Sequence, residues 1–174
     1  LEIIQNIELG ENEYLLYTNY FGIKDEYVSQ LACKYKEHLI VDNAQALYAV
    51  PSDYLNAIYS PRKFVGIPDG GIAYSSRSID VNGIDLDTSS YDRCSHLLKR
   101  IDGGASFGYG DFRENAEKLS SLPLLQMSQL TRKLMMAADY GQIKERRTSN
   151  FEYLHENLKQ WNRFDMPSTD SFAC

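Results

Sequence analysis

The 174-residue sequence contains no apolar run that approaches the ~20 residues of a membrane-spanning helix, and it shows no signal-peptide pattern. Cysteine is scarce, because only Cys33, Cys94 and Cys174 are present and they lie far apart. Their number and spacing argue against a disulfide framework and against a metal site. Such cysteine usage is typical of a reducing compartment, so we expect a cytoplasmic protein outside the membrane.

Basic residues are fewer than acidic ones. Lysine and arginine total 18 against 24 aspartates and glutamates, which gives a formal net charge of −6. Nucleic-acid-binding proteins usually carry a basic face, so this balance argues against a general nucleic-acid binder. Hydrophobic residues make up 43% of the chain, which is ordinary for a globular protein of a length that can bury a core.

The first half of the sequence alternates short apolar runs with one amphipathic segment. The predicted strands are residues 13–18, 38–42, 57–59 and 70–75. A helix is predicted over residues 24–36, because Tyr27, Leu31 and Tyr35 recur at a spacing of four. Residues 51–53 mark a turn in an irregular stretch. Near-continuous apolar strands around a helix favour a parallel sheet that is covered on both faces.

The second half is helical in pattern. Ser89 and Asp92 have the spacing of a capping box, and Gly103-Gly104 ends the helix that follows. Further helices are predicted over residues 111–121, after Ser128 as N-cap, and over residues 139–161. The apolar seam of the last helix is formed by Phe151, Leu154, Leu158 and Trp161. One α/β layer with helices packed across it is the simplest architecture.

Polar residues follow three of the predicted strands. They are Asn19, Asp42 and the turn from Ser60 to Lys63. Ligands of open α/β sheets bind at the carboxyl ends of the strands, so we expect these three positions to converge on one small molecule.

Lys63 is the candidate nucleophile. A lone lysine is most often a surface residue, but this one lies in a short turn between apolar runs, with Gly66, Gly70 and Gly71 following. A lysine held in an apolar pocket has a lowered pKa and attacks carbonyl groups. The spacing Ser60-x-x-Lys63 also occurs in penicillin-binding proteins and class A β-lactamases. That alternative is excluded, because Pro68 and the glycines prevent the required helix and the partner motifs are missing.

Asp42 and Gln45 are candidate ligands for an aromatic cofactor. Asp42 follows Leu-Ile-Val, so it is either a loop cap or the partner of a pyridinium nitrogen, which a carboxylate keeps protonated. Gln45 is either a satisfied loop amide or a hydrogen-bond partner of the cofactor's phenolic oxygen. The hydroxyl of Ser60 is a candidate phosphate ligand.

These residues resemble a known family. Asp42-Asn43-Ala44-Gln45 is similar to the Asp-x-Ala-Gln signature of the DegT/StrS-type sugar aminotransferases, which have the aspartate-aminotransferase fold, or fold type I. Ser60-Pro61-Arg62-Lys63, followed by Asp69-Gly70-Gly71, resembles the Schiff-base lysine of that fold and the strand start after it.

The resemblance implies a pyridoxal 5′-phosphate enzyme that transfers an amino group from a small-molecule donor to a keto acceptor, often a keto sugar linked to a nucleotide. It implies a homodimer, with Lys63 forming the Schiff base and then carrying protons, and with Asp42, Gln45, Ser60 and Asn19 binding the cofactor. The implied fold is an incomplete PLP-transferase large domain, residues 1–88, with a mostly parallel sheet. Residues 89–174 then lead toward a small domain. We expect the chain to be part of a longer protein and to bind cofactor weakly, because the family's glycine-rich phosphate loop is not found.

Two alternatives remain from the sequence. The fold is retained as a non-catalytic binding or interaction module, or the chain belongs to a fold-type-I lyase or desulfurase. The latter needs a mobile catalytic cysteine, and no cysteine lies near the site motifs. Arg62, Tyr109 and Arg113 receive no role from the sequence.

Overall fold

The computed structural model describes residues 7–50 and 56–163. Contacts divide the chain into two compact units. Unit 1 comprises Leu1–Tyr59, Ala73–Ser78 and Lys144–Cys174, and unit 2 comprises Ser60–Ile72 and Ile79–Ile143. The units therefore interleave along the sequence and do not coincide with the ranges 1–88 and 89–174. The turn predicted at residues 51–53 lies outside the described residues.

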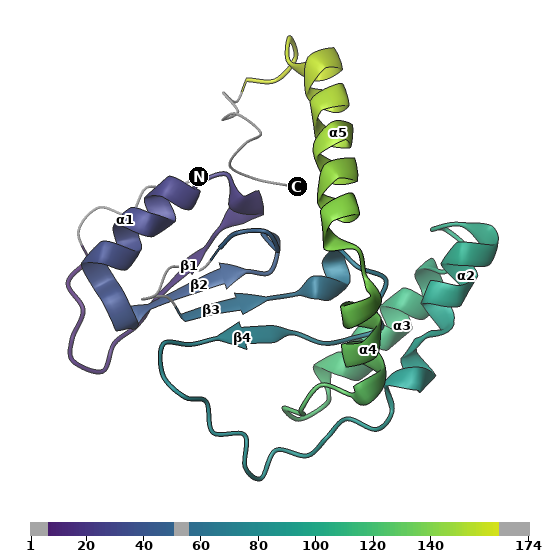
Figure 1. Cartoon of the computed structure of the whole chain (residues 1–174), viewed down its shortest axis with the longest axis horizontal. Coiled ribbons are helices and arrows are strands. Elements are labelled where there is room, and N and C mark those ends of the chain that lie inside the picture. Colours follow the sequence, from purple (N-terminus) through teal and green to yellow (C-terminus); the bar gives the residue numbers. More distant parts are fainter. Residues whose placement is uncertain (1–6, 51–55, 164–174) are drawn as a thin grey trace. The chain divides into compact units, whose positions relative to one another are not determined.

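A four-stranded, mostly parallel sheet confirms the predicted α/β class. Its strands are β1 (Leu15–Thr18), β2 (Leu39–Asn43), β3 (Asn56–Tyr59) and β4 (Ile72–Tyr74), and they lie in this order. The pairs β1·β2 and β2·β3 are parallel, and β4 runs in the opposite direction (Figure 1). All four predicted strands are confirmed.

The core of unit 1 lies between one face of the sheet and helix α1 (Asp25–Tyr35). Alternate residues of the strands face the helix, and Leu39 and Val41 are completely buried. The opposite face is more open, because Leu16 is 61% and Ile58 44% exposed. The expectation that both faces are covered is therefore wrong for these strands.

Helix α1 forms where the apolar spacing predicts it. Val28, Leu31 and Tyr35 are buried against the sheet, and Tyr27 packs edge-on against Tyr17 with ring centroids 5.6 Å apart. Burial of this one apolar stripe stabilises the helix more than its intrinsic propensity does, as is usual for short helices.

The second half of the chain is helical, as predicted. Its helices are α2 (Ser95–Gly103), α3 (Tyr109–Ser120), α4 (Gln129–Ala137) and α5 (Tyr140–Leu158). Helix α2 ends at the predicted glycines, where Gly104 has a φ of 83° that favours glycine. The predicted seam of α5 is largely exposed, since Leu154, Leu158 and Trp161 are at least half open to solvent.

The capping box predicted at Ser89 and Asp92 is wrong. Residues Ser90–Arg93 form a short 3₁₀ turn before α2, and the side chain of Ser89 caps no helix. Its hydroxyl instead donates to Asp87 Oδ1 (3.1 Å) and accepts from Arg93 Nη1 (3.0 Å). The hydroxyl that the sequence pattern assigned to a helix cap therefore belongs to an ionic cluster of Asp87 and Arg93.

The predicted N-cap of α4 is confirmed. Ser128 is buried, and its hydroxyl accepts a hydrogen bond from the backbone N–H of Thr131 at 3.0 Å. We expect Ser128→Ala to lower the free energy of unfolding by about 1 kcal/mol, the usual contribution of such a cap. The measurement is urea denaturation. The control is Ser121→Ala, because this exposed hydroxyl only donates to Lys118 O and its loss should cost under ~0.5 kcal/mol. Equal losses in the two variants would contradict the assignment.

Candidate functional site

The carboxyl ends of β1, β2 and β3 form a polar edge in unit 1. Thr18 pairs with Asp42 in the register of β1 and β2, and Asn43 pairs with Tyr59 in that of β2 and β3. Asn19 directly follows β1, and its backbone N–H donates to the carbonyl of Asp42 at 3.0 Å. The structure thus brings together two of the residues predicted from strand ends, Asn19 and Asp42.

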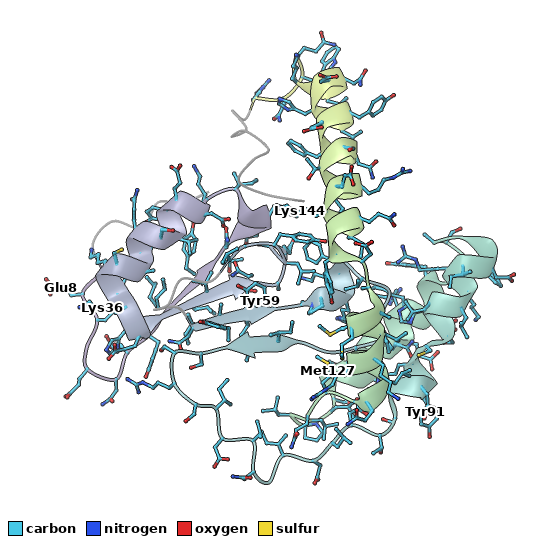
Figure 2. The ribbon with its side chains drawn as sticks, in the orientation of Figure 1. Glu8, Lys36, Tyr59, Tyr91, Met127 and Lys144 are labelled. Atoms are coloured by element: carbon cyan, nitrogen blue, oxygen red, sulfur yellow. The ribbon has the colours of Figure 1, made fainter. Side chains whose placement is uncertain are left out.

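A hydrogen-bonded cluster is buried behind this edge. The Nδ2 amide of Asn19 donates to Asp25 Oδ1 at 2.7 Å and to Asn43 Oδ1 at 3.0 Å. Tyr59, labelled at the end of β3 in Figure 2, donates its hydroxyl to the carbonyl of Ala49 at 3.0 Å. Burial raises the pKa of the Asp25 carboxyl, and the hydrogen bond from Asn19 offsets part of that effect. Burial likewise raises the pKa of Tyr59, against a hydrogen bond from Asn43.

Asp42 retains an available carboxylate oxygen. Its Oδ1 accepts from the backbone N–H of Ala44 at 2.9 Å, which fixes the side chain in a turn. Its other oxygen has no hydrogen-bond partner among the described residues, and the side chain is half-buried. Asp42 therefore caps its loop, which is the first of the two alternatives from the sequence, and its role as the partner of a pyridinium nitrogen stays a prediction.

Lys63 ends a 3₁₀ turn, Pro61–Lys63, in unit 2. Its backbone N–H donates to the carbonyl of Ser60 at 3.1 Å, and Pro61 and Val65 are buried beneath the turn. The Lys63 side chain is exposed and makes no ion pair within the described part of the chain. The apolar pocket expected around this lysine is therefore not found, whereas the tight turn is.

Asp42 lies in β2, and Lys63, its predicted partner, follows the neighbouring strand β3. Asp42 pairs with Ile58 across β2 and β3, and Lys63 follows the last residue of β3, Tyr59, by four positions in the sequence. Adjacent parallel strands end at the same edge of a sheet. Asp42 belongs to unit 1 and Lys63 to unit 2, so their convergence on one ligand stays a prediction.

The remaining predicted residues occupy loops or exposed helix positions. Gln45 is half-buried in the turn after β2, where Ala46 N–H donates to Asn43 O at 2.9 Å. Ser60 is half-buried before the lysine turn. Tyr109 is 60% exposed on α3, and Arg113 forms only a long, exposed pair with Glu117 at 3.9 Å. Nothing in this geometry assigns a role to Tyr109 or Arg113.

Unit 2 contains a buried ionic cluster centred on Arg93. The guanidinium donates a hydrogen bond from Nε to Asp69 Oδ2 at 2.8 Å, and its Nη2 forms ion pairs with Asp69 Oδ2 at 2.7 Å and with Asp87. The second oxygen of Asp69 accepts from the hydroxyl of Thr131. Burial alone would raise the pKa of Asp87, but the hydrogen bonds from Ser89 and the charge of Arg93 outweigh it and hold that pKa below its ordinary value.

A hollow of about 160 Å³ lies beside this cluster, bordered by Asp69, Asp87, Leu119, Leu122 and Met127. Both carboxylates already have partners. Asp69 is bound by Arg93 and Thr131. Asp87 is bound by Arg93 and by the hydroxyls of Ser89 and Ser90. The cluster therefore has a structural role: it holds Asp69, in the segment that follows Lys63, against Arg93 and Thr131.

Sequence reasoning missed Asp25, Asn43 and Tyr59. Asn43 carried a usable signal, because it directly follows Asp42 at a strand end. Asp25 carried none, since its contact with Asn19 depends on a sharp turn at Phe21 and Gly22, whose φ values of 57° and 74° are both positive.

No family model, no curated protein and no solved structure matches this chain. In the described ranges, no group of three or more candidate ligands is placed to hold a metal ion. None of the helices in those same ranges is both long and apolar enough to cross a membrane.

Proposed function

We propose that this chain is part of a pyridoxal-phosphate-dependent aminotransferase that acts in the cytoplasm and transfers an amino group to a keto substrate. The observation that carries the proposal is the free carboxylate oxygen of Asp42 at the end of β2, beside the strand that leads to Lys63. A carboxylate at the end of β2 and a primary amine four residues after the end of β3 are the two chemical groups that the two ends of a pyridoxal ring require.

The donor and acceptor set fits the cofactor. Asp42 offers an acceptor for a protonated ring nitrogen, and Lys63 an exposed primary amine for an aldehyde. In the described part of the chain, Asn19 has a buried Oδ1 without a hydrogen-bond partner, which suits a donor on the cofactor. Ser60 precedes the lysine turn and suits the phosphate. Few phosphate ligands are visible, so weak binding is expected.

When bound, pyridoxal phosphate supplies an electron sink for amino-acid chemistry. In that setting, the negative charge of Asp42 favours a protonated ring nitrogen, and Asn19 and Gln45 orient the ring through hydrogen bonds. Lys63 supplies the amine and afterwards accepts and returns a proton at its Nζ, the role of a general acid and base. The family further suggests a homodimer and a sugar-nucleotide acceptor, which we include as part of the proposal.

Asp42→Asn tests the charge of the carboxylate. We expect it to weaken cofactor binding by at least about tenfold, because a hydrogen bond to a charged group contributes about 1.5–3 kcal/mol. The measurement is the amount of cofactor that borohydride fixes on Lys63 across a titration with millimolar pyridoxal phosphate.

The matched control is Asp80→Asn. Asp80 Oδ1 accepts from the backbone N–H of Asn82 at 2.9 Å, the same local turn that Asp42 forms with Ala44. Asp80 is exposed and outside the proposed site, so its variant should bind like the wild type. Equal losses in both variants would show that the turn matters and the charge does not.

The exposed position of Lys63 favours one alternative, a non-catalytic binding module. The two functions differ in one reaction. An aminotransferase converts bound pyridoxal phosphate to the amine form when an amino acid is added and releases the corresponding keto acid, whereas a module binds the cofactor without this conversion.

A further inference from the structure

Asn19 has a buried side-chain amide whose nitrogen is hydrogen-bonded and whose oxygen is not, among the described residues. The residue is 1% exposed, and both hydrogens of its Nδ2 group are used, one by Asp25 and one by Asn43. Its Oδ1 is buried and has no hydrogen-bond partner among the residues that the structure describes. A buried acceptor without a partner is costly, so its presence calls for an explanation.

The neighbours of Asn19 fix which way the amide points. Asp25 and the Oδ1 of Asn43 both act as acceptors, so a flipped Asn19 would place its oxygen against two acceptors. Asn43 pairs with Tyr59 in the register of β2 and β3, and the Tyr59 hydroxyl donates to Ala49 O at 3.0 Å. The two acceptors therefore set the direction of the Asn19 amide. Among the described residues, its Oδ1 is left without a hydrogen-bond donor.

The backbone between Asn19 and Asp25 is bent to make this contact. Phe21, a non-glycine residue, has a φ of 57°, and Gly22 after it has a φ of 74°. Left-handed conformations are unfavourable for residues with a side chain, and they concentrate where a functional geometry requires them. The turn brings Asp25, in the first turn of α1, back to the side chain that follows β1.

We propose that Asp25 is a positioning residue, which orients Asn19 so that Oδ1 accepts a hydrogen bond from the bound ligand. The inference rests on the proposed function, in which the ligand is pyridoxal phosphate. The ligand must then present a protonated nitrogen or oxygen to Asn19. Shielding from water strengthens the hydrogen bond that this oxygen accepts. Asp25 itself acts through Asn19 and does not touch the ligand.

The first test is independent of the cofactor. In the free chain, NMR should show slow hydrogen exchange for the Asn19 side-chain amide. Asp25→Ala should speed that exchange at least about tenfold, since an acceptor is lost, whereas Asp25→Asn should preserve it by supplying an amide oxygen. Asn56 is the internal control. Its amide donates to Glu37 O and Leu39 O at the other end of the sheet and should not change. Fast exchange of Asn19 in the wild type would overturn the proposal.

The second test uses pyridoxal phosphate as the probe. We expect Asp25→Ala to weaken the labelling of Lys63 by about five- to tenfold and Asp25→Asn by less than about twofold, with unfolding midpoints measured to correct for lost stability. Equal weakening in both variants would indicate that the charge of Asp25 acts directly, and would overturn the positioning role. If the wild type takes up no cofactor at Lys63, the proposed function and the ligand assigned to Asn19 both fail. The amide exchange then still decides whether Asp25 orients Asn19.

Discussion

Lys63→Ala should abolish the adduct that borohydride fixes when the chain is incubated with pyridoxal phosphate, down to the background of the other lysines. The reason is chemical, because only a primary amine condenses with the aldehyde, and Lys63 is the lysine that follows the last residue of β3 by four positions in the sequence. Lys63→Arg should lose the adduct equally, since it keeps the positive charge but offers no amine of this kind. The adduct is measured by the mass of the intact chain.

Lys159→Ala is the matched control. Lys159 is exposed like Lys63, but it follows α5 and lies far from the site motifs in the sequence. Its removal should lower the total adduct only by its own share of the background. If the Lys159 and Lys63 variants lose the same amount, the labelling follows exposure alone and Lys63 is an ordinary surface lysine.

Arg93→Ala is expected to destabilise the chain by about 3–5 kcal/mol, because it leaves the buried carboxylates of Asp69 and Asp87 without their cation. Thermal or urea unfolding measures the loss. Arg113→Ala is the control, since its exposed pair with Glu117 should contribute under ~1 kcal/mol. If Arg93→Ala does not fold, Arg93→Lys tests the same point. Arg93→Lys keeps the charge but not the forked geometry of the guanidinium. Its loss of stability should therefore be smaller than that of Arg93→Ala and larger than that of Arg113→Ala.

The stability difference between the wild type and Arg93→Ala should depend on pH. In the wild type the pKa of Asp87 is lowered, so its contribution to stability is present above its unfolded pKa and is lost as the pH falls through its folded pKa. In Arg93→Ala, Asp87 keeps its burial but loses the charge of Arg93, so its pKa rises above the wild-type value and its protonation on acidification reduces the destabilisation. The stability difference between wild type and variant should therefore narrow from pH 7 toward about pH 4. A constant difference would contradict the ionic explanation.

The sequence predicted the local elements well where the signal was local. The spacing of Leu31 and Tyr35 located α1, and Ser128 located the start of α4, because each depends on residues within one or two turns. The capping box at Ser89 failed because charged side chains nearby compete for its hydroxyl. Its hydroxyl is taken by Asp87 and Arg93, and that cluster is completed by Asp69, 24 residues before Arg93.

The candidate site was predicted in part for a related reason. Strand ends are visible in a sequence, so Asn19 and Asp42 were expected at one edge, and the structure joins them by a backbone hydrogen bond. The partners of those residues were not visible. Asn43 and Tyr59 meet through the register of β2 and β3, and Asp25 reaches Asn19 only through the positive-φ turn. Register and backbone strain are set by the whole fold, and the sequence pattern alone does not specify them.

The exposure of Lys63 is the feature that the sequence misjudged most. Apolar residues flank it in the chain, but Pro61, Val65 and Ile67 turn inward and leave its side chain outside. A buried flank therefore anchors the turn without enclosing the lysine. This agrees with the weak cofactor binding that we expect of the chain.

The most direct test of the central claim is to identify which lysine carries the cofactor. The wild-type chain is incubated with millimolar pyridoxal phosphate, reduced with borohydride, digested, and mapped by mass spectrometry. We predict that Lys63 carries at least about ten times the mean modification of the other lysines, a preference of about 1.4 kcal/mol, and that Asp42→Asn removes this preference. Modification spread over the lysines according to their exposure, unchanged in Asp42→Asn, would contradict the account.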